Sequence, residues 1–281
     1  MGEDACDCGV GAMKKEDLII VRGGGDIATG TIYRLWKSGY RVLVTETDKP
    51  SAIRRQVAVS EAVYSGIAKI EDMVACLADS VEEIATIHER NEIPVIIDGK
   101  GSLIDRLKPK AVVDAILAKR NINTSIDMAE LVIALGPGFE AGKDAHYVIE
   151  TIRGHNLGRI ISEGCALPNT GIPGSIGGYT HERVLHADAQ GIMHNIRKIG
   201  DIVEKGDVIA IIAGENNVEV RATISGIIRG LIRDEYPVTK GFKIADIDPR
   251  VEELRNCFTI SDKARCISGS VLELVCANTV T

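Results

Sequence analysis

A glycine-rich turn that follows an apolar run constrains the fold of this chain most strongly. Residues 18–21 are apolar, and the chain then runs through three glycines into an amphipathic segment that ends near Gly39. This order predicts a strand, a tight turn and the start of a helix. The turn matches the Gly-x-Gly-x-x-Gly/Ala pattern, whose free N–H groups hold a pyrophosphate at a helix start. The residues expected to bind a dinucleotide cofactor here are Gly23, Gly24, Gly25, Asp26, Ile27 and Ala28.

Glu46 stands where a ribose-binding carboxylate is expected. A second apolar run, 42–45, ends in Glu46 roughly 20 residues beyond the glycines, at the position from which a carboxylate accepts a hydrogen bond from a ribose hydroxyl. Asp26 departs from the pattern, because its charge repels a bare pyrophosphate unless a cation or a capped N–H group offsets it. A glycine-rich turn without a ligand is the alternative, since a turn alone does not prove binding.

Short apolar runs alternate with helical or polar stretches over the first 160 residues. Such alternation is typical of a parallel α/β sheet, which binds ligands outside the carboxyl ends of its strands. Gly136 and Gly138 follow the run at 131–135, so we expect both to join the cofactor-binding residues. The adjacent Arg54 and Arg55 either clamp a phosphate group or form a solvated face.

Residues 146–159 bring opposite charges and a histidine into one bend. A predicted strand carries Glu150 into a turn that holds Arg153, His155 and Arg159. These residue types suit acid–base chemistry or anion binding. We therefore expect Glu150, Arg153 and His155 to be catalytic and Arg159 to contact the cofactor, with no metal site. In the alternative, the histidine is structural and the glutamate pairs with an arginine to fix the turn.

Residues 161–190 are rich in glycine and proline and predict a linker or lid. Beyond them, the pattern V-x-K-G-x-x-I-A-x-I occurs at 203–212 and again at 238–247. Two such short-strand units resemble the barrel-sandwich of biotinyl and lipoyl domains. That family modifies a lysine on the hairpin between its halves, and here the hairpin at 214–217 contains none. A structural or docking domain is therefore expected over 191–250.

Charge and composition exclude several classes of function. The formal net charge is -7 and aromatic residues make up 4% of the chain, so we expect no nucleic-acid partner. No apolar run reaches the roughly 18 residues of a membrane helix, and seven scattered cysteines favour a reducing compartment, so a cytoplasmic location is expected. Cys6 and Cys8 lie in a leader, 1–16, that is either flexible or a metal or redox tail. Cys165 is reactive only if a neighbour stabilises its thiolate.

These observations predict an α/β fold with a Rossmann-like parallel sheet domain and a small all-β barrel-sandwich domain. The first domain covers 17–160 and is completed by a C-terminal helix within 251–281, which Ser261 caps. The linker or lid at 161–190 joins it to the β domain at 191–250. The oligomeric state stays open, with a homo-oligomer among the options.

Several motifs in one order resemble the YqeB family, accessory proteins of selenium-dependent molybdenum hydroxylase systems. The similarity runs from about Asp17 to the last helix, and the first domain is distantly similar to xanthine dehydrogenase accessory factors. The motifs are the glycine turn, Ala52-Ile53-Arg54-Arg55, Gly136-Pro137-Gly138-Phe139, Glu150-Thr151-x-Arg153-Gly154-His155, Pro168-Asn169-Thr170-Gly171-x-Pro173-Gly174 and Asp246-x-Asp248-Pro249-Arg250.

The resemblance implies a cytoplasmic accessory protein for the maturation of a molybdenum hydroxylase. Its partners would be the hydroxylase apoenzyme and a small-molecule dinucleotide, and its cofactor molybdopterin dinucleotide or NAD(P). The family supplies no chemical step and no residue roles. Two alternatives remain, an NAD(P)-dependent oxidoreductase and a partner-docking scaffold that binds no ligand.

Overall fold

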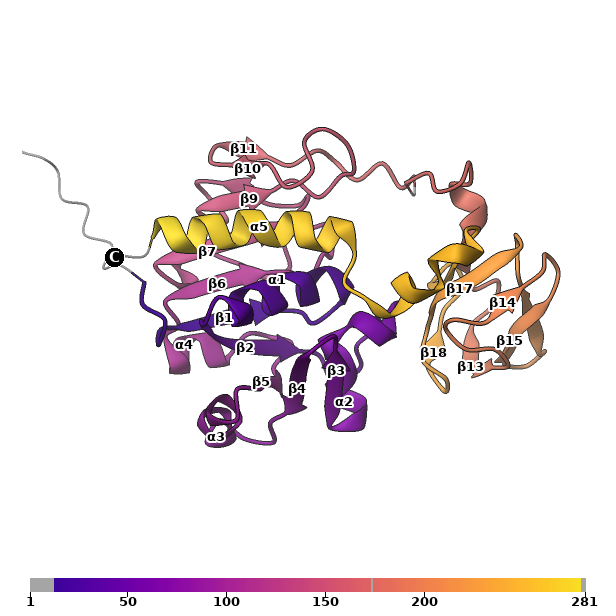
Figure 1. Cartoon of the computed structure of the whole chain (residues 1–281), viewed down its shortest axis with the longest axis horizontal. Helices are drawn as coiled ribbons and strands as arrows, with labels where there is room; N and C mark the ends of the chain where they lie inside the picture. Colours follow the sequence, from indigo (N-terminus) through magenta and orange to yellow (C-terminus); the bar gives the residue numbers. More distant parts are fainter. Residues whose placement is uncertain (1–12, 173, 279–281) are drawn as a thin grey trace, which may run out of the picture.

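The computed structural model describes residues 13–172 and 174–278. Figure 1 shows a large sheet flanked by helices and a smaller region made of strands. The chain passes from the first region to the second through the extended segment near residues 166–180, and it returns through the residues that precede the last helix (Figure 1). Residues 1–12 of the predicted leader, which include Cys6 and Cys8, lie outside the described residues.

The large sheet has nine strands in the order β10-β9-β7-β6-β1-β2-β5-β4-β3. The middle residues of its central strands are apolar and buried, because helices cover both faces of the sheet. The parallel strands are β1 (Leu18–Arg22), β2 (Arg41–Glu46), β4 (Met73–Leu77), β5 (Ile93–Ile97), β6 (Ala111–Asp114), β7 (Leu131–Leu135) and β9 (Tyr147–Ile149). At the edges, β3 (Ile67–Ile70) and β10 (Ile160–Ile161) run antiparallel to their neighbours.

Two helices lie side by side over one face of the sheet, α1 (Asp26–Lys37) and α5 (Asp262–Ala277) (Figure 1). They share a buried core with Ile19 and Val21 of β1. The opposite face, which holds Ile20, is covered by α3 (Glu83–Glu89) and α4 (Leu103–Leu107). The short α2 (Ala62–Ser65) lies at the β3 edge, and β8 (Glu140–Ala141) pairs with β11 (Gly164–Cys165).

The last helix confirms one local prediction. The Ser261 hydroxyl accepts a hydrogen bond from the Ala264 amide at 3.2 Å, which satisfies one of the unpaired N–H groups at the start of α5. Residues Ala264, Ile267, Val271, Leu274 and Val275 are buried against the sheet and α1.

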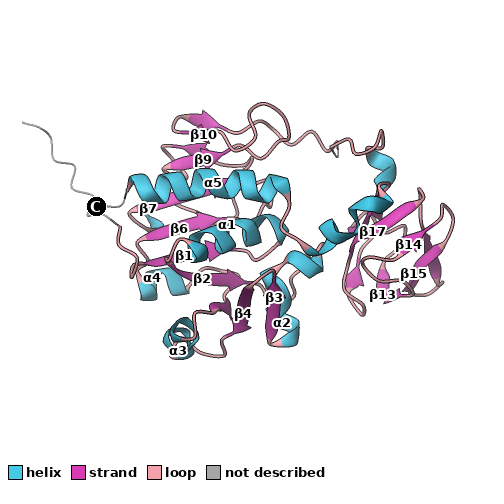
Figure 2. Ribbon diagram, in the orientation of Figure 1, coloured by secondary structure: helices cyan, strands magenta, loops and turns pink. Residues whose placement is uncertain are grey.

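The second region consists of two four-stranded antiparallel sheets around a separate apolar core (Figure 2). One sheet has the order β12-β19-β17-β14 and the other β16-β15-β13-β18. The strands are β12 (Val184–His186), β13 (Gly191–Asn195), β14 (Ile202–Val203), β15 (Val208–Ala213), β16 (Val218–Arg221), β17 (Gly226–Leu231), β18 (Pro237–Val238) and β19 (Lys243–Asp248). The 3₁₀ segment Val251–Phe258 then leads back to α5.

The predicted fold class, a Rossmann-like parallel sheet domain with a small barrel-sandwich domain, is wrong. The large sheet is mixed, and the cause is local. β3 and β4 are joined by a tight turn at Glu71, and β9 and β10 by the short bend at 150–159, and strands joined so closely pair antiparallel. The domain boundaries drawn from the sequence stay a prediction.

Within the described residues, no helix has both the length and the apolar character needed to cross a membrane. The cytoplasmic location stays a prediction.

Candidate functional site

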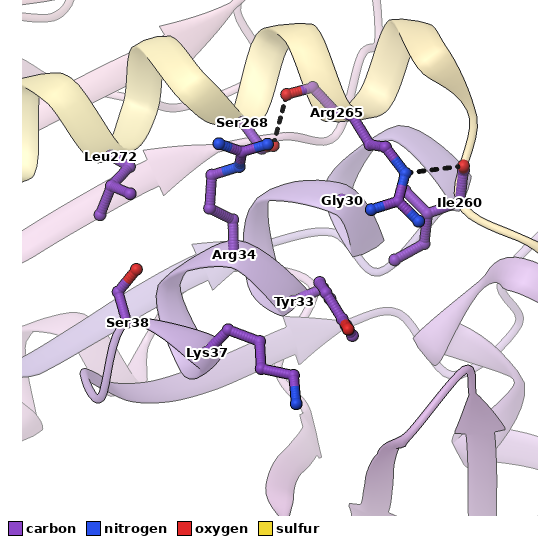
Figure 3. A pocket seen from close by; sticks show the side chains of 9 residues that line it. All are labelled: Gly30, Tyr33, Arg34, Lys37, Ser38, Ile260, Arg265, Ser268 and Leu272. Carbon is purple, nitrogen blue, oxygen red and sulfur yellow. Dashed lines mark hydrogen bonds between the residues drawn. The ribbon is translucent and has the colours of Figure 1, made fainter.

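Two cavities are candidate sites. The smaller is a groove of about 250 Å³ between α1 and α5, and Figure 3 shows the side chains of Tyr33, Arg34 and Arg265 around it. Its cations are largely neutralised by carboxylates. Asp72 accepts hydrogen bonds from Tyr33 and Lys37, and Glu71 accepts one from Arg265 at 2.6 Å. This groove therefore has little charge left for a ligand.

The larger cavity, called the crevice below, lies between the nine-stranded sheet and the second region and has a volume of about 620 Å³. The loops that follow β1, β6, β7 and β9 form one wall, so the crevice lies at the carboxyl ends of parallel strands, where α/β sheets bind ligands. Strands β12, β17 and β19 form the other wall, and α5 begins at its edge. A volume of this size suits a small molecule.

Positive charge dominates the crevice. Among its described lining residues, two carry carboxylates, Asp26 and Asp246, and two more are histidines, His181 and His186. The cationic side chains come from both walls and from the start of α5, and they are Arg54, Lys119, Arg153, Arg183, Arg229, Lys243 and Lys263. This excess contrasts with the chain as a whole, whose formal net charge is -7.

Asp246 is the carboxylate at the centre of this charge. It lies on β19 with 4% of its surface exposed, accepts a hydrogen bond from Arg183, and has an Arg229 nitrogen at 3.8 Å. Burial raises the pKa of Asp246, while Arg183, Lys243 and Arg229 act in the opposite direction. The single negative charge of Asp246 thus balances only part of the positive charge around it, and the remainder is available to a ligand.

Arg54 contributes a buried donor without an acceptor. Its side chain is 6% exposed, and its Nη1 and Nη2 atoms donate to Asp26 at 3.3 Å and to the Asn256 carbonyl at 3.0 Å. Its Nε atom has no hydrogen-bond partner within the part of the chain that the structure describes. A buried unsatisfied donor costs stability, so Arg54 is held at the crevice at the expense of one unpaired N–H group.

Two lysines of the crevice also lack close carboxylates. Across residues 13–172 and 174–278, no ion pair within 4.0 Å involves Lys243 or Lys263. Desolvation lowers the pKa of both amines. For Lys263, the neighbouring Arg153 lowers the pKa further.

The glycine turn is packed against the protein's own backbone. The Gly24 amide donates to Glu46 Oε2 at 2.7 Å, and the Gly24 carbonyl accepts from the Ser60 amide at 2.9 Å. A Cβ atom on Gly24 would meet that amide nitrogen at 2.9 Å. Glu46 also accepts from the Thr47 amide, and burial raises the pKa of Glu46. In this structure Glu46 therefore caps the turn.

The predicted cofactor-binding residues are only partly brought together. Asp26 and Ile27 line the crevice, and Gly25 adjoins them with open space around its α-carbon. Three others pack closely against the chain: Gly23 on Ile116, Gly136 on Thr151 and Gly138 on Arg120, while Ala28 is fully buried in the core.

The residues of the bend at 150–159 also fall into two groups, one that lines the crevice and one that does not. Arg153 lines the crevice and donates two hydrogen bonds to Asp262, at 2.7 and 2.8 Å. Glu150 is 3% exposed, and its carboxylate accepts from three backbone amides, so it holds the loop together. His155 and Arg159 are exposed and do not line the crevice. The roles assigned to these residues from the sequence stay predictions.

Sequence reasoning missed the cationic residues of the second region and of α5. Arg183, Arg229, Lys243 and Lys263 are far apart in the chain, and no spacing rule links them. One available signal was Lys263, a cation in the first turn of a predicted helix, where the helix dipole disfavours positive charge. Among the described residues no cluster of three or more His, Cys, Asp or Glu could hold a metal ion.

Comparison with known proteins gives one close relative. The chain is 52% identical over 256 residues, 91% of its length, to the uncharacterized protein YqeB of Escherichia coli K12. The chain is thus similar to YqeB over nearly all of its own length. The chain spans about half of that relative, 47% of its length, and no family model matches the chain.

Solved structures give distant similarities. They include the product-bound ectoine utilization protein EutE (DoeB) from Ruegeria pomeroyi, at 13% identity and a TM-score of 0.26, covering 83% of this chain and 85% of that one. An aspartoacylase family protein from Mesorhizobium loti, at 15% identity and a TM-score of 0.30, covers 84% and 86%. A succinylglutamate desuccinylase from Silicibacter sp. TM1040 has 12% identity and a TM-score of 0.24, with coverage of 84% and 85%.

These comparisons correct the predicted function. The similar structures are described as ectoine utilization, aspartoacylase and desuccinylase proteins, and none as a molybdenum, selenium or nucleotide-binding protein. The prediction of an accessory protein for a molybdenum hydroxylase is therefore wrong. TM-scores of 0.24 to 0.30 carry no chemistry from those proteins to this chain.

Proposed function

We propose that the crevice binds a small polyanion, a molecule with at least two phosphate or carboxylate groups. The observation that carries this proposal is the charge of the walls, where seven lysine and arginine side chains face two carboxylates. Cations gathered in a concave site of low dielectric focus their field on the space between them, which favours an anionic ligand there. The same arrangement disfavours neutral and cationic molecules.

The charge repulsion within the crevice supports this proposal. Like charges brought together in a half-buried cavity repel each other and lose hydration, which costs stability. Natural chains keep such conflicts mainly where a site needs them. The buried Nε atom of Arg54, without an acceptor in the described chain, adds a second cost that an oxyanion would relieve. A ligand oxygen would turn each of these costs into a charge-assisted hydrogen bond.

A polymer is a poorer match than a small molecule. The crevice holds an excess of positive charge, while the chain as a whole carries a net charge of -7 that repels a long polyanion outside it. The cofactors expected from the sequence, molybdopterin dinucleotide and NAD(P), stay predictions, as does the hydroxylase partner.

Thermal unfolding with a ligand panel tests the proposal. Tripolyphosphate and citrate should raise the melting temperature, and glucose should leave it unchanged. A ligand at 100 times its Kd stabilises the folded state by about 2.7 kcal/mol. The shift should fall as salt is added, because ions screen the attraction.

Two matched variants locate the site. Arg229→Gln removes a cation from the crevice, and Arg34→Gln removes one from the groove between α1 and α5. The proposal expects a reduced tripolyphosphate shift for Arg229→Gln and a wild-type shift for Arg34→Gln. Equal shifts in both variants, or none in the wild type, would refute it.

A further inference from the structure

Lys263 occupies an unfavourable position for a cation. It is the second residue of α5, directly after Asp262 and the capping Ser261. The start of a helix carries partial positive charge, which favours carboxylates and disfavours an ammonium group. The side chain is nevertheless part of the crevice wall, together with Ser261. The position thus makes the ammonium form of Lys263 less favourable than it is for a lysine on the surface.

The charged neighbours of Lys263 act on its amine in both directions. Arg153 and Lys243 disfavour its protonation, and Asp26 and Glu150 favour it. The two carboxylates are occupied elsewhere: Asp26 accepts from Arg54, and Glu150 accepts from three backbone amides. Arg153 is held in place by its two hydrogen bonds to Asp262. Desolvation is the largest effect and lowers the pKa of Lys263.

A desolvated amine beside other cations is the arrangement that makes lysine nucleophilic towards carbonyl compounds. We infer that the Lys263 amine forms an imine with the carbonyl carbon of an anionic aldehyde or ketone held in the crevice. This inference rests on the proposed function, because the arginines and Lys243 bind the anionic group while Lys263 reacts.

The step needs no oxidant or reductant. The nitrogen lone pair of Lys263 forms the new C–N bond, and the carbonyl C–O bond breaks. The oxygen leaves as water with the two hydrogens of the neutral amine. The result is a C=N bond between the protein and the bound molecule.

Lys243 is a less suitable nucleophile. It lies at the start of β19 and is more exposed than Lys263, and Asp246 on the same strand favours its protonated form. We assign it to the binding of the anionic group.

Borohydride trapping tests the inference on the full chain. The protein is incubated with pyridoxal 5′-phosphate or with pyruvate, treated with borohydride, digested and examined by mass spectrometry. Pyridoxal, which lacks the phosphate, is the matched neutral probe. At limiting reagent, pyridoxal 5′-phosphate should label Lys263 at least tenfold more than Lys143, a lysine with 72% of its side chain exposed. Labelling by pyridoxal 5′-phosphate and labelling by pyruvate together show whether the crevice accepts a phosphate or a carboxylate group.

Two variants serve as controls. Lys263→Arg keeps the positive charge and should abolish the preferential label, and Lys143→Arg should leave it in place. Labelling spread evenly over surface lysines, centred on Lys243, or equal for pyridoxal and its phosphate overturns the inference. The tripolyphosphate shift of the wild-type protein is measured in the same preparation. A preserved shift without labelling rejects the imine alone, and loss of the shift rejects the proposed function as well.

Discussion

The contact between α1 and α5 provides a quantitative test of the structure, because both helices begin at the crevice. Gly30 of α1 meets α5 at Ala264, and a Cβ atom on Gly30 would lie 2.7 Å from the Ala264 Cβ and 2.8 Å from its carbonyl oxygen. Gly269 of α5 is the matched control, since a Cβ atom there would find its nearest neighbour, an Arg34 nitrogen, at 4.0 Å. The test compares Gly30→Ala with Gly269→Ala.

The two substitutions share one contribution to the free energy of unfolding, the helix propensity of alanine. They differ in a second, the steric cost of the new methyl group. Alanine is preferred over glycine inside a helix by about 0.8–1.0 kcal/mol, which applies to both positions. At Gly30 the new methyl group must push the two helices apart, and overpacking of this kind costs about 1–3 kcal/mol. We expect Gly269→Ala to stabilise the chain by up to about 1 kcal/mol. Gly30→Ala should lower the free energy of unfolding by up to about 2 kcal/mol, because the steric cost offsets the gain in helix propensity.

Urea unfolding followed by tryptophan fluorescence measures both values. The chain contains one tryptophan, Trp36, and it lies on α1, so the signal reports the region that holds the contact. The free energies of unfolding of the two variants should differ by about 1–3 kcal/mol, with Gly269→Ala the more stable. Equal stabilisation by the two substitutions would refute the close packing of α1 on α5.

Three further predictions concern charged groups. Glu46→Ala should lower the free energy of unfolding by about 1–3 kcal/mol, because the buried Gly24 amide loses its acceptor. The variant should keep the thermal shift with tripolyphosphate. Loss of that shift would contradict the capping role. Asp246→Asn should cost about 3–5 kcal/mol in urea unfolding followed by circular dichroism, since Arg183 stays charged and buried; a cost below 1 kcal/mol would contradict this. Hydrogen bonds from Arg153 hold the pKa of Asp262 below its usual range. The pair therefore stabilises the folded chain above about pH 4, and this stabilisation is lost as the pH falls. Asp262→Asn should cost less than about 1 kcal/mol at pH 7, because the pair is exposed, and the difference from wild type should shrink in acid.

Local features of the fold could be read from the sequence. The run at 18–21, the glycine turn and the helix after it occur as expected, and Ser261 caps the last helix. These features depend on residues close together in the chain, where periodicity and turn chemistry are informative. The direction of the edge strands β3 and β10 depends on which strand each one pairs with. The apolar pattern carries little information on that choice.

The site was harder to predict for the same reason. Glu46 was expected to bind a ribose, yet its carboxylate lies within hydrogen-bonding distance of the Gly24 amide. The spacing that suggests a cofactor contact equally permits a cap, and the two differ only in three-dimensional geometry. Conversely, Arg229 and Lys243 belong to strands of the second region, and the fold brings them opposite Asp26. A charge cluster assembled across two regions has no local signature.

The central claim is that an oxyanion binds among the cations of the crevice, and the position of a bound anion tests it most directly. Crystals soaked in selenate, a tetrahedral dianion, would show that position by anomalous scattering from selenium. The account predicts a peak within hydrogen-bonding distance of Arg54 Nε or of Arg229, Lys243 or Lys263. Peaks confined to the groove between α1 and α5 or to the outer surface, with an empty crevice, would contradict it.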